Sequence, residues 1–247
     1  QVLAMRIAVM GAGAVGGYFG GVLANQSEDV TLIARGAHGE AIAKNGLKVD
    51  SHWGNFTVNV PVTDDPSTVG EVDLILHCIK LYSNAEAFPT MKPMIGEKTT
   101  ILTIQNGATS GSIIGKAFGA NHVLQGATYI ETGITGPGHI HQSGSTAMIE
   151  FGEEDGSTTP RIEAIQNLLN REEIQIKVSS NIVDTLWNKM VSVGAIGSVM
   201  AASRASFSEI LASPHGEHSV RTTMEEIVAV GQSQGVTFPP RCVESKM

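Results

Sequence analysis

The chain has the length and composition of a folded protein with one large domain or two modest ones. Of its 247 residues, 42% are hydrophobic and 16% are charged, which excludes overall disorder. The formal net charge of −8 argues against a surface for nucleic acid or for an anionic membrane. The two cysteines, Cys78 and Cys242, lie far apart, so neither a disulfide framework nor a cysteine metal site is predicted.

Targeting and metal-binding signals are also missing from the sequence. No apolar run reaches the roughly 20 residues that a membrane-spanning helix needs, and no signal peptide precedes the first predicted strand. We therefore expect a cytoplasmic protein with no membrane or nucleic-acid partner. No metal site is predicted, because His139 and His141 have no further ligand residues nearby. The acidic run at residues 153–155 is typical of a solvated turn.

Apolar strands alternate with helical segments over the first part of the chain, and residues 47–50 and 56–62 are predicted to form the two strands of a hairpin. This alternation is typical of a Rossmann-like α/β fold, in which a doubly wound parallel sheet is covered on both faces. The predicted strands are residues 6–11, 30–34, 72–79 and 100–104, and the predicted helices between them are residues 14–25, 37–44 and 84–94.

The pattern of residue types along the chain changes after residue 123 and again near residue 180. Residues 123–151 read as antiparallel strands that extend the sheet, and they are followed by a helix at 159–170 and a strand at 174–178. We therefore predict a nucleotide-binding domain over residues 1–180 and a smaller all-α domain over 181–247. The all-α domain is short, so we expect its C-terminal part to be missing. Its predicted helices are residues 182–202, 206–211 and 216–234.

A glycine-rich turn directly follows the first strand and opens the first helix. Gly11, Gly13 and Gly16 fill the three positions of the dinucleotide-binding fingerprint. Gly11 permits a tight turn, Gly13 lets backbone N–H groups approach a diphosphate, and Gly16 lets the helix pack on the strand. A glycine turn in some other α/β protein is the alternative, but the strand before it and the apolar helix after it favour a dinucleotide. The predicted cofactor-binding residues here are Gly11, Ala12, Gly13, Ala14, Val15 and Gly16.

The end of the second strand indicates which dinucleotide is bound. An acidic residue there would hold the ribose of NAD, whereas a basic one favours the 2′-phosphate of NADP. Arg35 occupies this region, and Asp29 lies at the start of the strand rather than at its end. The planar guanidinium matches phosphate oxygens, so NADP(H) is favoured over NAD(H). The alternative is an arginine solvated in an ordinary loop.

Three further motifs follow in order. Cys78-Ile79-Lys80 closes one predicted strand, Gln105-Asn106-Gly107 closes the next, and Leu186-Trp187-Asn188-Lys189 lies on the first helix after residue 180. Together with the glycine turn and Arg35, these motifs make the chain resemble the ketopantoate reductase (2-dehydropantoate 2-reductase) family. The resemblance extends over essentially the whole chain.

The resemblance implies that three residues, Lys80, Asn106 and Lys189, are catalytic. Lys80 and Asn106 lie at the carboxyl ends of parallel strands, where open α/β sheets bind ligands, and the family uses the matching residues to contact cofactor and substrate. The family's catalytic lysine corresponds to Lys189, which would act as the general acid. The family also implies a small 2-keto acid substrate and a homodimer. The alternatives are a surface lysine at 80, an ordinary Asn-Gly turn at 106 and a solvated helix lysine at 189.

The sequence departs from the family at positions that bear on the substrate. The family's substrate-binding asparagines correspond to Val193 and Gly197, and its further active-site serine and glutamate would lie beyond Met247. Three functions therefore stay open. The first is NADPH-dependent reduction of 2-dehydropantoate to pantoate in pantothenate biosynthesis. The second is reduction of another small 2-keto acid, or turnover of a 3-hydroxy acid, and the third is a non-catalytic NADPH-binding protein that acts as a sensor or engages a partner.

Overall fold

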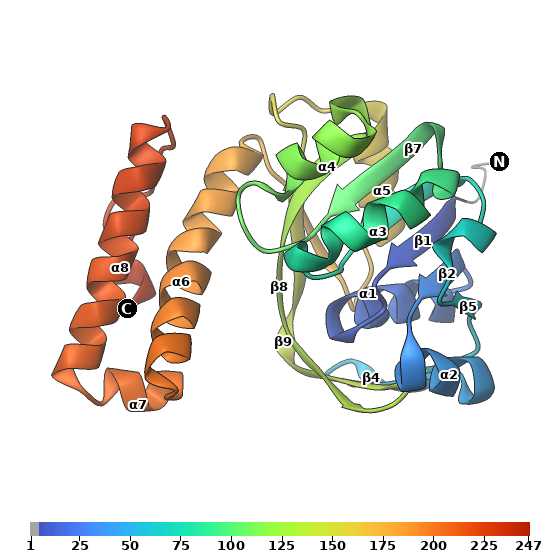
Figure 1. Cartoon of the computed structure of the whole chain (residues 1–247), viewed down its shortest axis with the longest axis horizontal. Coiled ribbons are helices and arrows are strands. Elements are labelled where there is room, and N and C mark those ends of the chain that lie inside the picture. The colour runs from blue at the N-terminus through green and yellow to red at the C-terminus, as the bar shows by residue number, and fades with distance from the viewer. Residues whose placement is uncertain (1–4) are drawn as a thin grey trace. The chain divides into compact units, whose positions relative to one another are not determined.

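The computed structural model describes residues 5–247, which divide into two compact units (Figure 1). The first unit runs as far as Gln105 and resumes over Thr109–Ser180. The second unit comprises Asn106–Ala108 and Asn181–Met247. The main division between the two units falls after Ser180.

Within the described residues, ten strands of the first unit form one sheet, in the order β4-β3-β9-β8-β7-β6-β1-β2-β5, with β10 paired to β9. Most neighbouring strands are parallel, as the alternation of strands and helices predicts. The strands are β1 (Arg6–Met10), β2 (Asp29–Ile33), β3 (Leu47–Ser51), β4 (Gly54–Val58), β5 (Val62–Thr63), β6 (Val72–His77), β7 (Ile95–Thr103), β8 (Val123–Gly136), β9 (His139–Gly152) and β10 (Gln175–Val178).

Six of these strands have the topology of a dinucleotide-binding fold. The run β5-β2-β1-β6-β7-β8 is parallel throughout, and counted in chain order it reads 3-2-1-4-5-6. The direction of winding reverses between β1 and β6. Ligands of open α/β sheets bind outside the carboxyl ends of the strands at such a reversal, which here is where the glycine turn follows β1.

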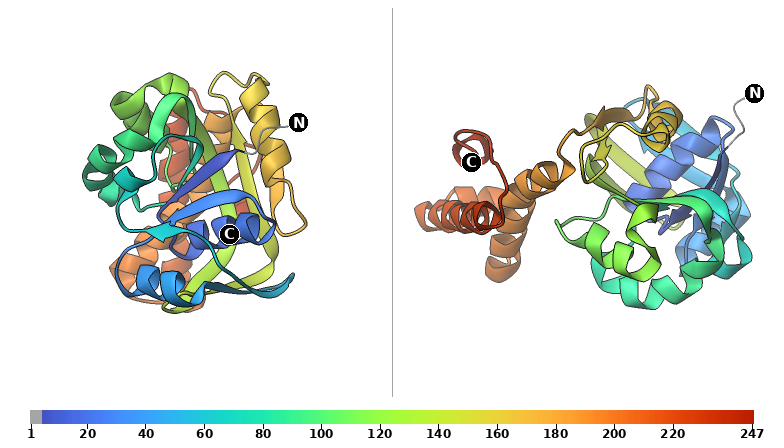
Figure 2. Two further views of the ribbon diagram at one scale, coloured as in Figure 1. Left: turned by 90° about the vertical axis from the view of Figure 1, so that its right-hand side faces the viewer. Right: turned by 90° about the horizontal axis from the view of Figure 1, so that it is seen from above.

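Helices cover both faces of the sheet, as Figures 1 and 2 show, with α1 and α5 on one face and α3 and α4 on the other. Alternate residues of β1 explain this arrangement. Ile7 and Val9 are buried in the cluster that contains Phe19 of α1, whereas Ala8 is buried in the cluster that contains Met91 of α3. The helices are α1 (Ala14–Asn25), α2 (Gly36–Asn45), α3 (Asn84–Met91), α4 (Ser110–Phe118) and α5 (Pro160–Leu169).

The antiparallel strands of the sheet are those that the sequence predicts, but their bounds differ. Strands β8 and β9 form the predicted antiparallel extension, and β3 and β4 form the predicted hairpin. The strand predicted at 56–62 is divided, however, into β4 and the short β5. Pro61 lies between them and has no N–H to donate, so its carbonyl oxygen alone joins the sheet by accepting from the N–H of Leu32.

The structure differs from the predicted elements at two other places. Strands β6 and β7 end at His77 and Thr103, so the motifs at 78–80 and 105–107 lie in the loops that follow the strands. The sequence does not predict helix α4, because this short segment contains two glycines and two serines, which lower helix propensity.

The second unit is helical, with α6 (Ile182–Ser203), α7 (Phe207–Leu211) and α8 (Pro214–Ser233). The side chains of Asn181, Ser206 and Ser213 cap the three helix N-termini by accepting backbone N–H groups. Val191 of α6 and Met224 of α8 are fully buried in the core of this unit. None of the helices in the described part of the chain is both long and apolar enough to span a membrane.

Candidate functional site

The glycine turn has the geometry that binding of a diphosphate requires. Gly11 has a φ of 93°, and a Cβ atom on it would lie 2.6 Å from Cγ2 of Ile79. A Cβ on Gly16 would overlap the carbonyl oxygen of Gly11 and lie 2.9 Å from Cβ of Cys78. Nothing lies within 4 Å of the corresponding position on Gly13, the N-cap of α1. The turn is therefore closed toward the protein and open at the positive end of α1, where an anion binds well.

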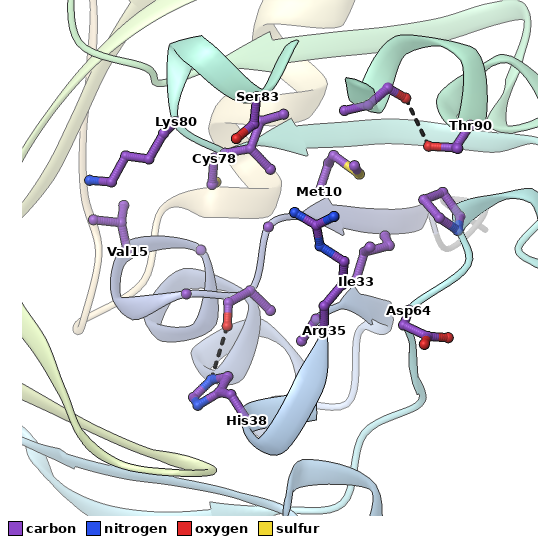
Figure 3. A pocket seen from close by; sticks show the side chains of 18 of the residues that line it. Met10, Val15, Ile33, Arg35, His38, Asp64, Cys78, Lys80, Ser83 and Thr90 are labelled. Carbon is purple, nitrogen blue, oxygen red and sulfur yellow. Dashed lines mark hydrogen bonds between the residues drawn. The ribbon is translucent and has the colours of Figure 1, made fainter. Parts of the chain in front are cut away.

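A cavity of about 810 Å³ adjoins this turn at the carboxyl ends of β1, β2 and β6 (Figure 3). Its volume lies within the usual range of cofactor sites, roughly 300–1,000 Å³. All the predicted cofactor-binding residues of the first unit line it: Gly11, Ala12, Gly13, Ala14, Val15, Gly16, Arg35 and Lys80. The fold therefore gathers these residues around one cavity.

Arg35 already has an ionic partner in the cavity. It is the residue before α2, and its Nη1 lies 2.7 Å from Oε1 of Glu86 in the first turn of α3. Both residues line the cavity, so the ion pair joins two of its walls. The side chains of Arg35 and Glu86 are 67% and 72% exposed, so the pair contributes little to stability.

His38 also lines the cavity, and it is a residue that the sequence analysis missed. The backbone N–H of Gly138 donates to its Nδ1 at 3.1 Å, so the proton is on Nε2, which donates to the carbonyl oxygen of Ala12 at 3.1 Å. Burial lowers the pKa of His38, which agrees with a neutral imidazole. His38 thus ties the glycine turn to the β8–β9 turn. In the sequence nothing separates it from a solvated histidine on a helix.

A buried polar network lies beneath the carboxyl ends of β6 and β7. His77 donates through Nε2 to Oδ1 of Asn84 at 3.0 Å, and Nε2 of Gln105 donates to the same oxygen at 2.8 Å. Gln105 also donates to the carbonyl oxygen of Ile79 at 2.8 Å. Burial lowers the pKa of His77 to about 4, so its imidazole is neutral, and its Nδ1 has no partner among the described residues. This network holds the peptide that precedes Lys80.

Lys80 projects from the loop that the network holds. It directly follows Ile79, and its exposed side chain lines the cavity near Val15 (Figure 3). Within residues 5–247 it forms no ion pair. Lys80 therefore offers a positive charge to an anionic or polar ligand in the cavity.

The other two predicted catalytic residues contact each other in the second unit. Lys189 of α6 donates through Nζ to Oδ1 of Asn106 at 2.9 Å. Burial lowers the pKa of Lys189 to about 8. One and two turns further along α6, Val193 and Gly197 are exposed, and neither has a polar side chain to offer a substrate.

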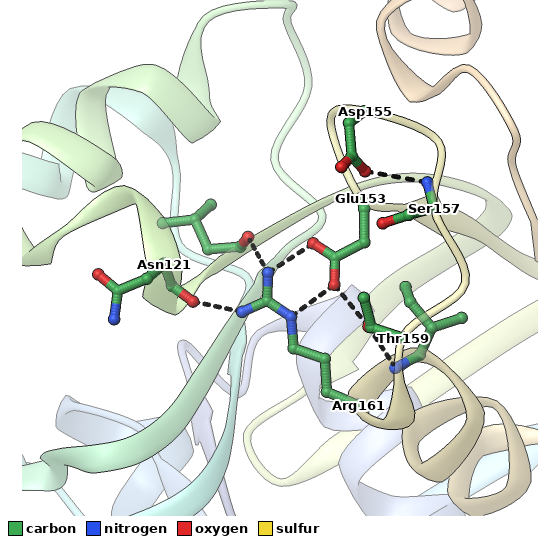
Figure 4. Close-up of polar contacts among 8 residues, drawn as sticks. Asn121, Glu153, Asp155, Ser157, Thr159 and Arg161 are labelled. Carbon is green, nitrogen blue, oxygen red and sulfur yellow. Dashed lines mark hydrogen bonds and ion pairs between the residues drawn. The ribbon is translucent and has the colours of Figure 1, made fainter.

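A second polar cluster, drawn in Figure 4, has a structural role. Arg161 donates through Nε to Glu153 at 2.7 Å and also donates to the carbonyl oxygen of Asn121, while Thr159 donates to Glu153 at 2.6 Å. Hydrogen bonding from Arg161 keeps the pKa of Glu153 below its usual value. The prediction of a solvated turn at 153–155 is thus wrong for Glu153, which is buried and anchors the start of α5.

The strand order, the glycine turn and the adjoining cavity define a dinucleotide-binding α/β protein with a separate helical unit. Comparison with known proteins narrows this class. The family profile described as "Ketopantoate reductase PanE/ApbA" matches residues 7–156, and the profile of its C-terminal part matches residues 181–247. The chain therefore belongs to the ketopantoate reductase family, whose members are oxidoreductases that act on CH–OH groups. This confirms the family to which the sequence motifs point.

Individual relatives agree with this assignment. An "Uncharacterized oxidoreductase YkpB" from Bacillus subtilis is 30% identical over 240 residues, which cover 97% of this chain and 79% of that protein. A 2-dehydropantoate 2-reductase from Streptococcus pyogenes serotype M1 is 29% identical, with 94% and 75% covered. The crystal structure of a 2-dehydropantoate 2-reductase from Geobacter metallireducens superposes with a TM-score of 0.90 at 31% identity, with 98% and 82% covered.

Proposed function

We propose that this protein reduces 2-dehydropantoate to pantoate with NADPH, a step in pantothenate biosynthesis, and that Lys189 is the general acid. The observation that carries this proposal is the 2.9 Å hydrogen bond between Lys189 and Asn106. Two separate motifs single out these residues, and they lie 83 positions apart in the chain. Their contact is expected if both act on one substrate.

The first unit fits the diphosphate of the cofactor. The open side of Gly13 and the backbone N–H groups at the start of α1 would hold this group, and Arg35 would bind the 2′-phosphate. A side chain on Gly11 or Gly16 would clash with the neighbouring backbone or with the loop after β6, so these glycines keep the turn in this form. When bound, the reduced nicotinamide supplies the hydride.

Lys189 would supply the proton. Hydride addition to a ketone builds negative charge on the carbonyl oxygen, and an ammonium group directed at that oxygen stabilises the charge and then protonates it. A pKa of about 8 leaves Lys189 largely protonated at neutral pH, yet makes it a stronger acid than an ordinary lysine. Asn106 accepts one of the N–H groups of Lys189 and so restricts the direction of the ammonium.

A second candidate function keeps this chemistry but changes the substrate. Val193 and Gly197 cannot supply amide hydrogen bonds to a small polar substrate, and the loss of such contacts can change specificity strongly. The substrate would then be another small 2-keto or 3-hydroxy acid. A non-catalytic NADPH-binding protein is the third candidate, but the lowered pKa of Lys189 argues for chemistry. The homodimer and the cytoplasmic location stay predictions.

A turnover screen separates these candidates. The protein is mixed with NADPH and with each member of a panel of 2-keto acids, and loss of the reduced-nicotinamide absorbance is followed. We expect 2-dehydropantoate to give the highest kcat/KM of the panel. A higher kcat/KM for another keto acid would select the second candidate. Tight NADPH binding, with no turnover of any keto acid and no oxidation of 3-hydroxy acids with NADP⁺, would select the third.

A further inference from the structure

We propose that Glu86 is a specificity-determining residue that weakens binding of the 2′-phosphorylated cofactor by competing with it for Arg35. This inference rests on the proposed function, in which Arg35 binds the 2′-phosphate. Oε1 of Glu86 lies 2.7 Å from Nη1 of Arg35, and both side chains line the cavity. A phosphate that binds Arg35 must therefore displace the carboxylate or share the guanidinium with it.

Two further carboxylates line the same cavity and add to its negative charge. Asp64 also lines the cavity and directly follows Thr63, which pairs with Ile33 just before the β2–α2 loop. Figure 3 shows that the Asp64 carboxylate points away from Arg35, so Asp64 adds charge to the cavity without pairing with the guanidinium. Asp65 lines it too, and hydrogen bonds from Ser67 hold its pKa below the usual value, so it is ionised.

Among the described residues that line the cavity, Lys80 is the other cation, and it lies near Val15 rather than beside Arg35 (Figure 3). His38, three residues after Arg35, is neutral, because its Nδ1 accepts the backbone N–H of Gly138. A phosphate monoester would bring about two further negative charges to this end of the cavity. NADH has only a ribose hydroxyl at that position, which needs no cation and can donate to a carboxylate. Glu86 should therefore lower the affinity for NADPH and leave the affinity for NADH nearly unchanged.

The experiment measures dissociation constants of NADPH and of NADH by fluorescence titration at one fixed ionic strength. The variant is Glu86→Gln, which removes the charge from an exposed side chain and keeps its shape. The matched control is Glu97→Gln, which makes the same change in net charge on an exposed residue near the start of β7. We expect Glu86→Gln to bind NADPH about threefold to tenfold more tightly, the range that loss of an exposed ion pair and of one repulsion allows. Binding of NADH by Glu86→Gln and binding of both cofactors by Glu97→Gln should stay within about twofold of the wild type.

Unchanged or weaker NADPH binding by Glu86→Gln would overturn the proposal, and so would an equal gain for both cofactors. The variant Arg35→Ala separates this failure from failure of the proposed function. If Arg35 binds the 2′-phosphate, Arg35→Ala weakens NADPH binding and spares NADH binding. Equal effects on both cofactors would refute the phosphate site itself, whatever Glu86 does. In the Arg35→Ala background, Glu86→Gln should give a smaller gain for NADPH, and a full gain there would show that Glu86 does not act through Arg35.

Discussion

Burial makes Lys189 a stronger acid than an ordinary lysine. Desolvation disfavours the ammonium form and lowers its pKa from an ordinary value near 10.5 to about 8. The Leu-Trp-Asn-Lys motif predicts the position of this lysine on a helix. Its contact with Asn106 could not be predicted, because it depends on how a loop 83 residues earlier meets α6.

This pKa predicts the pH dependence of the reaction. Reduction needs the protonated lysine, so kcat/KM should be constant below pH about 8 and then fall by about tenfold per pH unit. The reverse oxidation needs the neutral amine, so its rate should rise through the same range. Both profiles are measured with saturating cofactor in buffers of equal ionic strength. A reduction rate that stays constant up to pH about 10 would rule out Lys189 as the acid.

Arg35 illustrates what a motif predicts and what it omits. Its position after the second strand follows from the spacing that begins at Gly11, and the structure places it in the cavity. Its ionic partner Glu86 lies 51 residues further along the chain and belongs to no motif. A pattern of residues at one turn carries no information about which side chain on a distant helix faces it.

At the level of elements, the parallel strands and their helices were predictable because each has a strong local signal. Apolar runs of strand length, helical periodicity and the glycine turn all occur within short windows. The hairpin of β3 and β4 was also predictable, but its parallel pairing with β9 was not. That pairing joins residues about 90 positions apart, and polarity alternation alone does not select a partner strand.

The hydrogen bonds among His77, Asn84 and Gln105 join the ends of β6 and β7 to α3, and their contribution to stability can be tested. Gln105→Leu would leave Asn84 and the carbonyl oxygen of Ile79 without their shared donor in a buried place. We expect it to lower the free energy of unfolding by about 1–3 kcal/mol. It should also raise the KM for NADPH, because the loop that carries Lys80 loses an anchor.

Urea denaturation measures the first effect and steady-state kinetics the second. The control is Gln166→Leu, the same substitution on an exposed position of α5, which should change neither quantity. If Gln105→Leu matches the wild type in both measurements, the network does not hold the loop.

The whole molecule combines two units to which we assign different tasks. The first unit presents the glycine turn, Arg35 and Lys80 around one cavity, and the second presents Lys189 with Asn106. The matched relatives are somewhat longer than this chain, which covers 75–82% of those described above. The substrate is the least predictable property, because Val193 and Gly197 remove the polar groups that would identify it.

We propose above all that Lys189 donates the proton and takes no part in holding the cofactor. The most direct test compares Lys189→Ala with the wild type in two measurements, kcat for the best keto acid and the dissociation constant of NADPH. We predict that kcat falls by about 10²–10⁴-fold, whereas NADPH binds within about twofold of the wild type. Retention of most of the wild-type kcat would show that Lys189 is not the proton donor.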